Sequence, residues 1–325
     1  MAEYAIRIHQ TGGPEVLQYE EIELPPPGDG EVRVRYTAIG LNFVETYLRS
    51  GLYPTQLPTG LGTEGAGVVT ELGERTFGFA VGDRVARATG PFGCYATAQN
   101  VPTGHLVPIP DRVSDEAAAA VMLKGLTAWY LLRRTYPVHS GETVLFHAAA
   151  GGVGLIAGQW LRHLGVHAIG TAGSPEKAKL AAEHGYSEVI LYRDEDVAAR
   201  VRELTDGAGV PVVYDSVGAS TFVNSLDCLR PRGLMVSFGN SSGPVTGVDL
   251  GILAAKGSLF VTRPTTAHYL APGEELQAAA NELFDLVASG AIQPQIGQRF
   301  ALADAPAAHR ALESRATTGS TVLLP

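Results

Sequence analysis

The strongest constraint on this chain is an alternation of short apolar runs with helix-like stretches over residues 143–263. The first of these stretches carries Ile156, Ala157 and Trp160 at the spacing of one helix face. Strands that alternate with helices form a parallel sheet covered on both faces. The sequence therefore predicts an α/β domain with a doubly wound parallel sheet. The predicted strands are TVLFHA, VHAIGTA, EVILYR, PVVYDSV, LMVSFG and GSLFVTR.

A glycine-rich turn joins the first predicted strand to the first helix. The segment FHAAAGGVG fits the pattern A-x-x-G-x-x-G, with Ala148 in the place of the usual first glycine. Such a turn lets the backbone approach a pyrophosphate, and the N–H groups at the helix start face the anion. A purely structural turn is the alternative, but the consecutive strand–helix units favour a dinucleotide site. We expect the phosphates to contact Ala150, Gly151, Gly152, Val153 and Gly154.

The end of the second strand predicts which nicotinamide cofactor binds. A free ribose 2′-hydroxyl is normally bound by an acidic side chain about 20 residues after the turn, but this strand ends GTAGSPEK, without an acid at Gly173. Glu176 falls in the first turn of the next helix, where it stabilises the helix dipole. Ser174 and Lys177 are better placed to bind a 2′-phosphate. We therefore expect NADPH, with Tyr192 either adding a phenol to that pocket or lying on the surface as an aromatic side chain.

The rest of the chain has a different organisation. In the segment EVRVRYTAIG, Val32, Val34 and Tyr36 alternate with polar residues, as in a half-buried strand, and more short strands follow. Ser114 is the predicted N-cap of a helical connector. The last residues contain two helical segments but no domain-sized core. We expect a mainly β domain over 1–125, a nucleotide domain over 126–263, and a C-terminal part over 264–325 that packs back on the first domain.

Composition argues against several function classes. The net charge of -9 disfavours a nucleic-acid partner. The most apolar run, AAAAVMLKGLTAWYLL, is broken by Lys124 and Gly125, so we expect no membrane span. Cys94 and Cys228 are too few and too far apart for a disulfide framework. We expect both to be small buried side chains of a protein in the reducing cytoplasm.

The sequence lacks the spacing of a catalytic metal site. Zinc catalysis needs three protein ligands and an open position. His163 and His167 are close in sequence, but Gly165 lies between a helix end and the next strand, so the two need not share a face. A Ser–His pairing or an H-E-x-x-H motif is also not evident. We therefore expect no metal, and a chemistry that depends on the cofactor.

Six segments carry a resemblance that goes beyond these patterns: GLGTEGAGVV, LKGLTAWYLL, HAAAGGVGLIAGQWLRHLG, VVYDSVG, GLMVSFGNSSGPVTGVDLG and ESRATTGSTVLLP. Together they resemble the quinone oxidoreductases, the zeta-crystallin-like branch of the medium-chain dehydrogenase/reductase superfamily. The resemblance implies a GroES-like catalytic domain, a Rossmann domain that binds NADPH, and a homodimer. The zinc members carry GHE where this chain reads Gly62, Thr63 and Glu64, and a cysteine where it reads Asn42. Both differences remove metal ligands.

The resemblance also implies roles for individual residues. Asn42, Tyr47 and Tyr53 are the implied catalytic residues, beside the nicotinamide and the substrate entrance. Glu45 is implied to line the same cleft, although the bacterial members read Asp there. The implied cofactor contacts, besides the glycine-rich turn, are Phe43, Glu45, Thr127, Gly173, Ser174, Lys177, Tyr192, Ser216, Val217, Phe238, Gly239, Asn240, Ser241 and Arg315.

Pattern and resemblance together predict an NADPH-dependent quinone reductase that works without a metal. A quinone is electrophilic, so it accepts hydride from the nicotinamide if its ring is held in line and the developing oxyanion finds donors. Tyr47, Tyr53 and the Asn42 amide are the candidate donors. An enoyl or 2-alkenal reductase, which delivers the hydride to a conjugated C=C bond, is the alternative among enzymes. An RNA-binding or crystallin-like structural role is the alternative from a different class.

Overall fold

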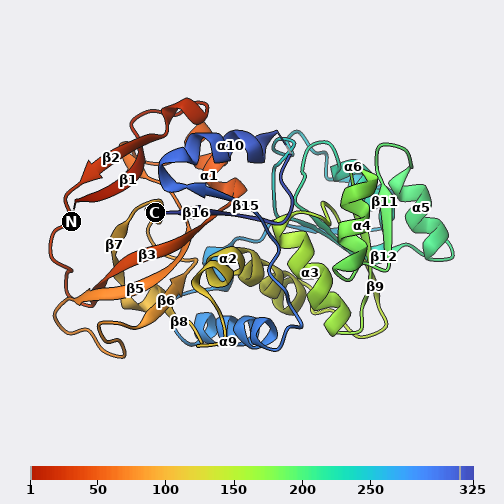
Figure 1. The fold of residues 1–325 in the computed structure, drawn as a ribbon. Coiled ribbons are helices and arrows are strands. Elements are labelled where there is room, and N and C mark those ends of the chain that lie inside the picture. Colours follow the sequence, from red (N-terminus) through yellow and green to blue (C-terminus); the bar gives the residue numbers. More distant parts are fainter. Residues whose placement is uncertain (1, 315) are drawn as a thin grey trace. The chain divides into compact units, whose positions relative to one another are not determined.

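The computed structural model describes residues 2–314 and 316–325, which divide into two compact units (Figure 1). Unit 1 takes in Met1–Leu126 and Leu270–Pro325, and unit 2 takes in Thr127–Tyr269. The second boundary lies later than the expected residue 263. Helix α8 (Thr266–Tyr269) stays with unit 2 because Tyr269 stacks on Tyr130, with ring centroids 5.0 Å apart.

Unit 2 is built on a parallel sheet with the strand order β11-β10-β9-β12-β13-β14. Counted from its first strand, that order is 3-2-1-4-5-6, the doubly wound Rossmann arrangement. The fold predicted from the alternation of strands and helices is therefore confirmed. The order reverses between β9 and β12, which is where such sheets bind ligands at the carboxyl ends of the strands. The strands are β9 (Thr143–Phe146), β10 (His167–Ala172), β11 (Glu188–Leu191), β12 (Val210–Asp215), β13 (Leu229–Ser237) and β14 (Phe260–Thr262).

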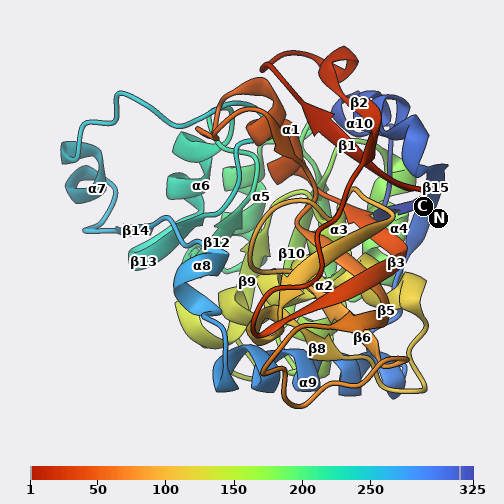
Figure 2. The same ribbon diagram turned by 90° about the vertical axis from the view of Figure 1, so that its left-hand side faces the viewer.

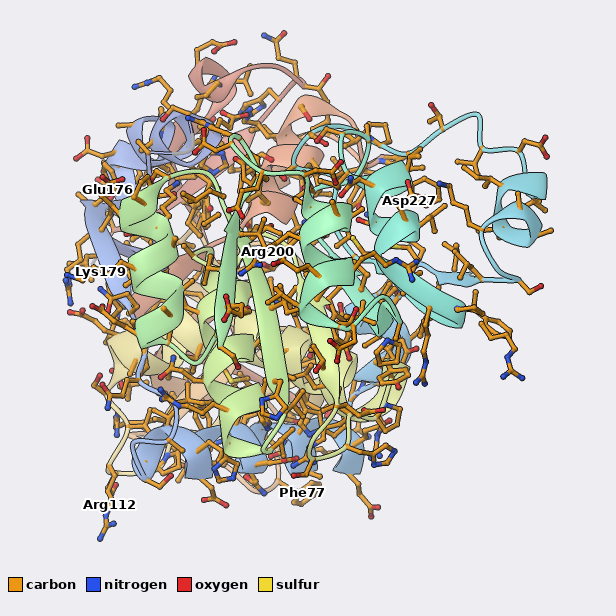
Figure 3. All side chains as sticks on the ribbon, turned by 90° about the vertical axis from the view of Figure 1, so that its right-hand side faces the viewer. Phe77, Arg112, Glu176, Lys179, Arg200 and Asp227 are labelled. Carbon is orange, nitrogen blue, oxygen red and sulfur yellow. The ribbon has the colours of Figure 1, made fainter. Side chains whose placement is uncertain are left out.

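Helices cover this sheet and keep their charges on the outside. Helix α3 is buried more completely than a one-face stripe predicts, because Leu155 and Leu161 are buried as well as Ile156 and Trp160. Figure 3 shows the charged side chains of the next helices pointing away from the sheet, Glu176 among them. Cys228 is buried in this core, and Cys94 in that of unit 1, as expected. The helices are α3 (Gly152–His163), α4 (Pro175–Glu183), α5 (Val197–Leu204), α6 (Phe222–Cys228) and α7 (Gly251–Ala255).

Unit 1 is mainly β and is organised around β3 (Glu31–Leu41). One edge of β3 pairs antiparallel with β5 (Glu64–Leu72). Its other edge pairs first with β7 (Ala98–Pro102) and then with β16 (Ser320–Leu324), so the C-terminal strand completes the sheet beside β3. The other strands are β1 (Glu3–Ile8), β2 (Gln18–Ile22), β4 (Thr59–Gly60), β6 (Arg84–Arg87), β8 (Val107–Pro108) and β15 (Ile296–Ala301).

The predicted alternation along β3 is observed over its first part. Val32, Val34 and Tyr36 are buried while the residues between them are not. From Ala38 to Leu41 every residue is buried, so the end of β3 lies inside the unit, directly before the residues expected to be catalytic. Short 3-10 turns at Pro14–Val16, Thr103–His105 and Leu302–Asp304 and a π-helical turn at Leu131–Thr135 complete the elements.

Four longer helices belong wholly or partly to unit 1. Helix α2 (Asp115–Tyr130) begins as predicted, since the Ser114 hydroxyl accepts a hydrogen bond from the Ala117 N–H at 3.2 Å. It runs across the boundary between the units at Leu126. The other helices are α1 (Phe43–Ser50), α9 (Glu274–Ala288) and α10 (Ala305–Glu313).

A buried arginine fixes the end of α1 to α10. Arg49 donates to His309 Nδ1 at 3.0 Å and to Glu313 Oε1 at 2.6 Å, and His309 Nε2 lies 3.2 Å from the Tyr95 hydroxyl. Burial and the Arg49 charge lower the pKa of His309 to about 3, so its imidazole is neutral and Nδ1 accepts the Arg49 proton. The C-terminal part of the chain thereby holds the helix that carries Tyr47.

The glycine-rich turn makes the first prediction, which concerns stability. A Cβ on Gly154 would lie 2.5 Å from the Ala148 carbonyl oxygen and 2.6 Å from that of Ala149, so the turn has no room for a side chain. We expect Gly154→Ala to lower the free energy of unfolding by about 1–3 kcal/mol, measured by urea denaturation. Gly104→Ala is the control, because its Cβ would meet Pro272 Cβ at 3.4 Å, an ordinary contact. Equal stability of the two variants would contradict the close approach.

Candidate active site

The residues expected to be catalytic begin at Asn42, which follows β3 and caps α1. Its backbone N–H donates to Glu45 Oε2 at 2.7 Å, one half of a capping box. Its side-chain Nδ2 donates to Glu64 Oε1 at 2.9 Å. Asn42 is 9% exposed, so both its backbone and its side chain are held in place inside unit 1.

Glu45 differs from the expectation that it lines a cleft and contacts the cofactor. It is fully buried, and its second oxygen, Oε1, accepts from the Thr63 N–H at 3.0 Å and from the Thr63 hydroxyl at 2.5 Å. Burial raises the pKa of Glu45 to about 7; the negative charge of Glu64 adds to this, while the Thr63 hydrogen bonds and the charge of Lys124 oppose it. The carboxylate therefore acts inside the protein, as a support for Asn42 and Thr63.

A buried ion pair that the sequence analysis missed lies on the other side of Asn42. Lys124 Nζ donates to Glu64 Oε1 at 2.5 Å, and the Leu123 N–H donates to Glu64 Oε2 at 2.6 Å. Glu64 is fully buried and Lys124 is 5% exposed. A signal for the pair was present, because a lysine inside an apolar helical run is almost never buried without a partner.

Three aromatic side chains form a row over the start of α1. The rings of Phe43 and Tyr47 are 6.3 Å apart, and those of Tyr47 and Tyr53 are 5.2 Å apart in an edge-to-face arrangement. The Tyr53 N–H donates to the Tyr47 carbonyl at 3.0 Å, which fixes the turn after the helix. All three side chains are half-buried. The structure thus brings Tyr47 and Tyr53 into contact in unit 1, while the Asn42 side chain is bonded to Glu64.

In unit 2, the glycine-rich turn follows β9 and leads into α3. Ala148 has the left-handed φ of 54°, and the Gly151 N–H donates to its carbonyl at 2.9 Å. Gly151 is the N-cap of α3 and offers no side-chain cap. The N–H groups of the first helical turn, at Gly152 and Val153, are therefore not capped by Gly151 and point to the carboxyl edge of the sheet, as an anion site requires.

The residues expected at a 2′-phosphate gather at the ends of β10 and β11. Ser174 caps α4, and its hydroxyl accepts from the Lys177 N–H at 3.4 Å. A Cβ on Gly173 would lie 2.5 Å from the Tyr192 hydroxyl oxygen, so the phenol lies against that glycine. Tyr192 is 44% exposed. Gly173, Ser174, Lys177 and Tyr192 therefore lie at one corner of the sheet.

The turns after β12 and β13 lie against each other. The Phe238 N–H donates to the Asp215 carbonyl at 2.8 Å, and the Ser241 N–H donates to the Ser216 carbonyl at 3.3 Å. Asn240 Oδ1 accepts from Arg263 at 3.0 Å, and Arg263 also donates to the Gly239 carbonyl at 2.9 Å. Arg263, which the sequence analysis did not single out, holds the second turn. The expected residues brought together here are Ser216, Val217, Phe238, Gly239, Asn240 and Ser241.

A chain of buried hydrogen bonds connects the glycine-rich turn after β9 to the turn after β12. The sequence analysis did not predict it. Ala148 N–H donates to Thr171 Oγ1 at 3.3 Å, and that hydroxyl is 3.1 Å from His147 Nδ1. His147 Nε2 is 3.0 Å from Ser225 Oγ, which donates to Asp215 Oδ2 at 2.8 Å. Burial lowers the pKa of His147, so its imidazole is neutral. Because the Ser225 hydroxyl donates to Asp215, it accepts from His147 Nε2, which therefore carries the proton. Asp215 Oδ1 in turn accepts from the Val217 N–H at 2.7 Å.

The expected cofactor contact Thr127 belongs to α2 and not to any of these turns. Thr127 is buried on α2, where its hydroxyl is a hydrogen-bond partner of Tyr130. Burial raises the pKa of Tyr130 to about 12, against the effect of that hydrogen bond. Arg315 lies outside the described residues.

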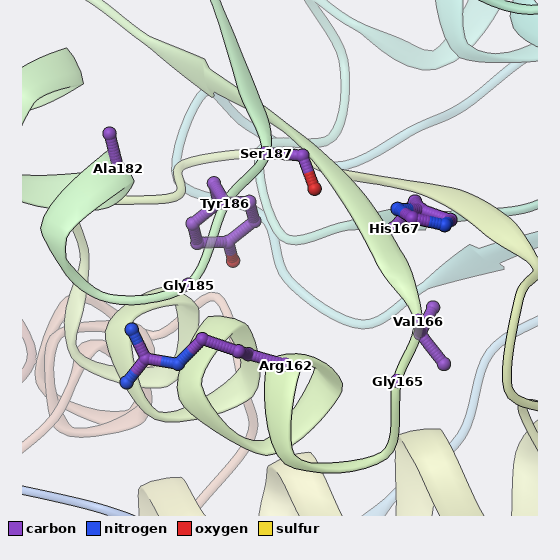
Figure 4. A pocket seen from close by; sticks show the side chains of 8 residues that line it. All are labelled: Arg162, Gly165, Val166, His167, Ala182, Gly185, Tyr186 and Ser187. Atoms are coloured by element: carbon purple, nitrogen blue, oxygen red, sulfur yellow. The ribbon is translucent and has the colours of Figure 1, made fainter.

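A shallow pocket in unit 2 involves none of the expected residues. It is lined by Arg162, Val166, His167 and Tyr186, at the amino-terminal end of β10, opposite to the edge that carries the glycine-rich turn (Figure 4). Within residues 2–314 and 316–325, no group of three or more His, Cys, Asp or Glu side chains could hold a metal ion. The described helices include none that is both long and apolar enough to cross a membrane.

Two protein-family models match the chain. The alcohol dehydrogenase GroES-like domain matches residues 28–111, and the zinc-binding dehydrogenase model matches residues 152–284. The first match falls in unit 1. The second begins at the start of α3, covers strands β10 to β14 of unit 2 and ends within α9 of unit 1.

Known proteins match the chain almost end to end. A quinone oxidoreductase of Pseudomonas aeruginosa is 61% identical over 98% of this chain and 99% of its own length, and a 2-haloacrylate reductase of Burkholderia sp is 44% identical over 98% of each. The crystal structure of Escherichia coli quinone oxidoreductase complexed with NADPH superposes with a TM-score of 0.98 at 52% identity, covering 99% of this chain and 100% of that one. The chain therefore belongs to the quinone oxidoreductase family of the medium-chain dehydrogenase/reductase superfamily.

Proposed function

We propose that this protein is an NADPH-dependent quinone reductase that transfers a hydride from the nicotinamide to a quinone without a metal. The observation that carries the proposal is the carboxyl edge of the sheet in unit 2. At this edge, the N-cap of α3 offers no side-chain hydrogen bond, and a Cβ on Gly154 would collide with the backbone of the turn. The segment after β10 carries Lys177 and has no acidic side chain at Gly173. The NADPH complex of the Escherichia coli relative supports the same cofactor.

The residues of unit 2 fit NADPH by their chemistry. Ala150, Gly151, Gly152, Val153 and Gly154 would hold the pyrophosphate through backbone N–H groups. Ser174, Lys177 and Tyr192 would bind the 2′-phosphate through a charge and two hydroxyls, with Gly173 leaving room beside the phenol. When bound, NADPH supplies the hydride. The turns at 216–217 and 238–241 would hold its distal half, and Phe43, Thr127 and Arg315 are proposed as further contacts.

The side chains of unit 1 would orient the quinone. One hydrogen of the Asn42 amide is committed to Glu64, so the phenols of Tyr47 and Tyr53 are the better donors for an oxygen that gains negative charge. The edge-to-face contact between these rings holds each phenol in one orientation. Water completes protonation of the product. Positioning contributes most of the rate enhancement in this proposal.

A homodimer is part of the proposal. Strand β14 is the last strand of its sheet, and it leaves Phe260 61% and Val261 41% exposed, with Leu250 75% exposed near α7 (Figure 2). An apolar edge strand of this kind pairs readily with a second copy. The two cysteines are free thiols, which supports a cytoplasmic location, and the net charge of -9 argues against a nucleic-acid partner.

Reduction of a conjugated C=C bond is the second candidate function. The observation that favours it is the 44% identity to a 2-haloacrylate reductase over 98% of both chains. The same residues would serve, because in both reactions a conjugated acceptor takes the hydride and negative charge develops on a carbonyl oxygen. The two functions differ in which substrate the aromatic row Phe43, Tyr47 and Tyr53 holds in line.

The cofactor assignment is tested by fluorescence titration with NADPH and NADH. Lys177→Ala should weaken NADPH binding about ten- to a hundredfold and leave NADH binding unchanged, because one charged hydrogen bond to the 2′-phosphate is lost. Lys179→Ala is the matched control, since Lys179 lies on the same helix and projects outward (Figure 3). Equal losses for both cofactors, or for both variants, would remove the assignment.

The substrate class is tested by a panel of acceptors with NADPH. We expect kcat/KM for naphthoquinones to exceed that for α,β-unsaturated aldehydes by tenfold or more. Oxidation of NADPH is followed by its absorbance, with the identity of each product checked separately. A preference for the aldehydes would establish the second candidate instead.

The charge of Glu45 leads to a pH-dependent prediction. Its pKa rises from 4.5 to about 7 on folding, so the folded state binds more protons between these values and stability falls as the pH increases through them. Glu45→Gln removes this dependence. Relative to the wild type, the variant should gain about 3 kcal/mol in unfolding free energy between pH 4.5 and pH 8.

Urea denaturation across this pH range measures the change, and the gain with pH is diagnostic whatever hydrogen bonds the substitution costs. Glu21→Gln, at an exposed position of β2, is the control and should differ from the wild type by the same amount at each pH. A constant difference for Glu45→Gln would show that folding does not shift the pKa of Glu45.

A further inference from the structure

The proposed function assigns no role to the buried ion pair of Glu64 and Lys124 beside Asn42. We propose that Glu64 and Lys124 form a positioning pair for the reaction, which holds the Asn42 amide in one orientation and sets the charge of Glu45 beneath the start of α1. This inference rests on the proposed function, in which Tyr47 and Tyr53, on and after the helix that Asn42 caps, orient the quinone.

Several elements of the fold provide the hydrogen bonds and the space that this ion pair needs. A buried ion pair is stable only when its remaining hydrogen-bonding capacity is satisfied, and Glu64 accepts from Asn42, Leu123 and Lys124. Space for the carboxylate depends on Gly40 of β3, because a Cβ there would collide with Glu64 Oε1 and with the Ala119 carbonyl oxygen. Strand β3, strand β5 and helix α2 therefore all shape this one site.

Asn42 lies between two carboxylates that hold different parts of it. Glu45 accepts from its backbone N–H, and Glu64 accepts from its side-chain amide. If Glu64 lost its charge or moved, Nδ2 would lose its strongest acceptor, and the amide could rotate. The expected result is a lower kcat with little change in the binding of NADPH, because the residues proposed to hold the pyrophosphate and the 2′-phosphate are in unit 2.

The same pair sets the electrostatics around Glu45. The charged groups that act on Glu45 are Glu64 from β5 and Lys124 from α2, while Arg49 of the same helix acts on the neighbouring Tyr95. The charge of Glu45 acts on Tyr95 and on Cys94, and burial raises the pKa of both side chains. Glu64 raises the pKa of Glu45 and Lys124 lowers it. Neutralising the two partners must therefore move the titration of Glu45 in opposite directions.

Opposite shifts test the electrostatic part of the proposal, because the two charges act on Glu45 with opposite signs. A fall in kcat at an unchanged KM for NADPH tests the positioning of Asn42. In Glu64→Gln the titration of Glu45 should move to lower pH, and in Lys124→Met to higher pH. Ionised Glu45 accepts from Asn42 and Thr63 together, so the acid limb of the kcat profile should follow the same shifts.

The experiment measures two properties of the full chain. The carboxyl carbon of Glu45 is followed by ¹³C NMR between pH 4.5 and 9, with its resonance assigned by Glu45→Gln. Steady-state kcat and KM are measured over the same range with NADPH and the naphthoquinone of the panel. Arg299→Met is the control, since Arg299 pairs with Glu116 of α2 at 2.8 Å on the surface, where Arg299 is 51% exposed.

We expect kcat to fall about tenfold in Glu64→Gln and Lys124→Met, KM for NADPH to stay within twofold, and the two Glu45 titrations to move apart by about one pH unit. Arg299→Met should match the wild type. Where Lys124→Met does not fold, the double variant Glu64→Gln/Lys124→Met removes both charges, and it should restore the Glu45 titration towards that of the wild type while kcat stays low.

Two results would overturn the inference. One is a Glu45 titration that is unmoved or moves in the same direction in both variants. The other is a kcat within twofold of the wild type in folded Glu64→Gln. The NMR arm needs no substrate, so a wild type that reduces no quinone would refute the proposed function while the pair is still tested by the titration of Glu45.

Discussion

The fully buried carboxylate of Glu64 is the point on which the reactive part of unit 1 depends. It receives hydrogen bonds from the residue that caps α1, from the backbone of α2 and from Lys124. A charge in such a position is costly unless every lone pair is used. Its donors come from different elements, so all of its hydrogen bonds form only when β5, α1 and α2 are in their native positions. The position of Asn42 follows from that requirement.

Unit 2 fixes its glycine-rich turn with a chain of buried hydrogen bonds. Its turn places Ala148 at a left-handed φ of 54°, which costs energy for a residue with a side chain. The Ala148 N–H is held by Thr171, and the hydrogen bonds continue through His147 and Ser225 to Asp215. Asp215 then accepts from the backbone after β12. The two turns on either side of the switch point are thus tied together by buried side chains, which keeps the nucleotide edge in one conformation.

Local patterns in the sequence predicted the backbone elements of the candidate site but not the buried hydrogen bonds and ion pair between its side chains. The alternation of strands and helices, the glycines of the turn and the cap at Ser114 depend on spacing or backbone freedom within a few residues, and each is found in the structure. Glu45 was misplaced, because no local pattern reveals whether a carboxylate at a helix start faces solvent or the interior. Lys124 was seen as a break in an apolar run, although its burial required a partner.

The sequence by itself determined the secondary structure, the doubly wound sheet and the family, because periodicity, glycine positions and extended similarity are written along the chain. Only the tertiary structure decided which polar groups meet. Glu64 finds its partners at Asn42 and Lys124, and His147 finds its partners at Thr171 and Ser225, all from other parts of the chain. Burial makes such partners obligatory, since a polar group removed from water must be satisfied. Sequence spacing carries no record of which distant group will do so.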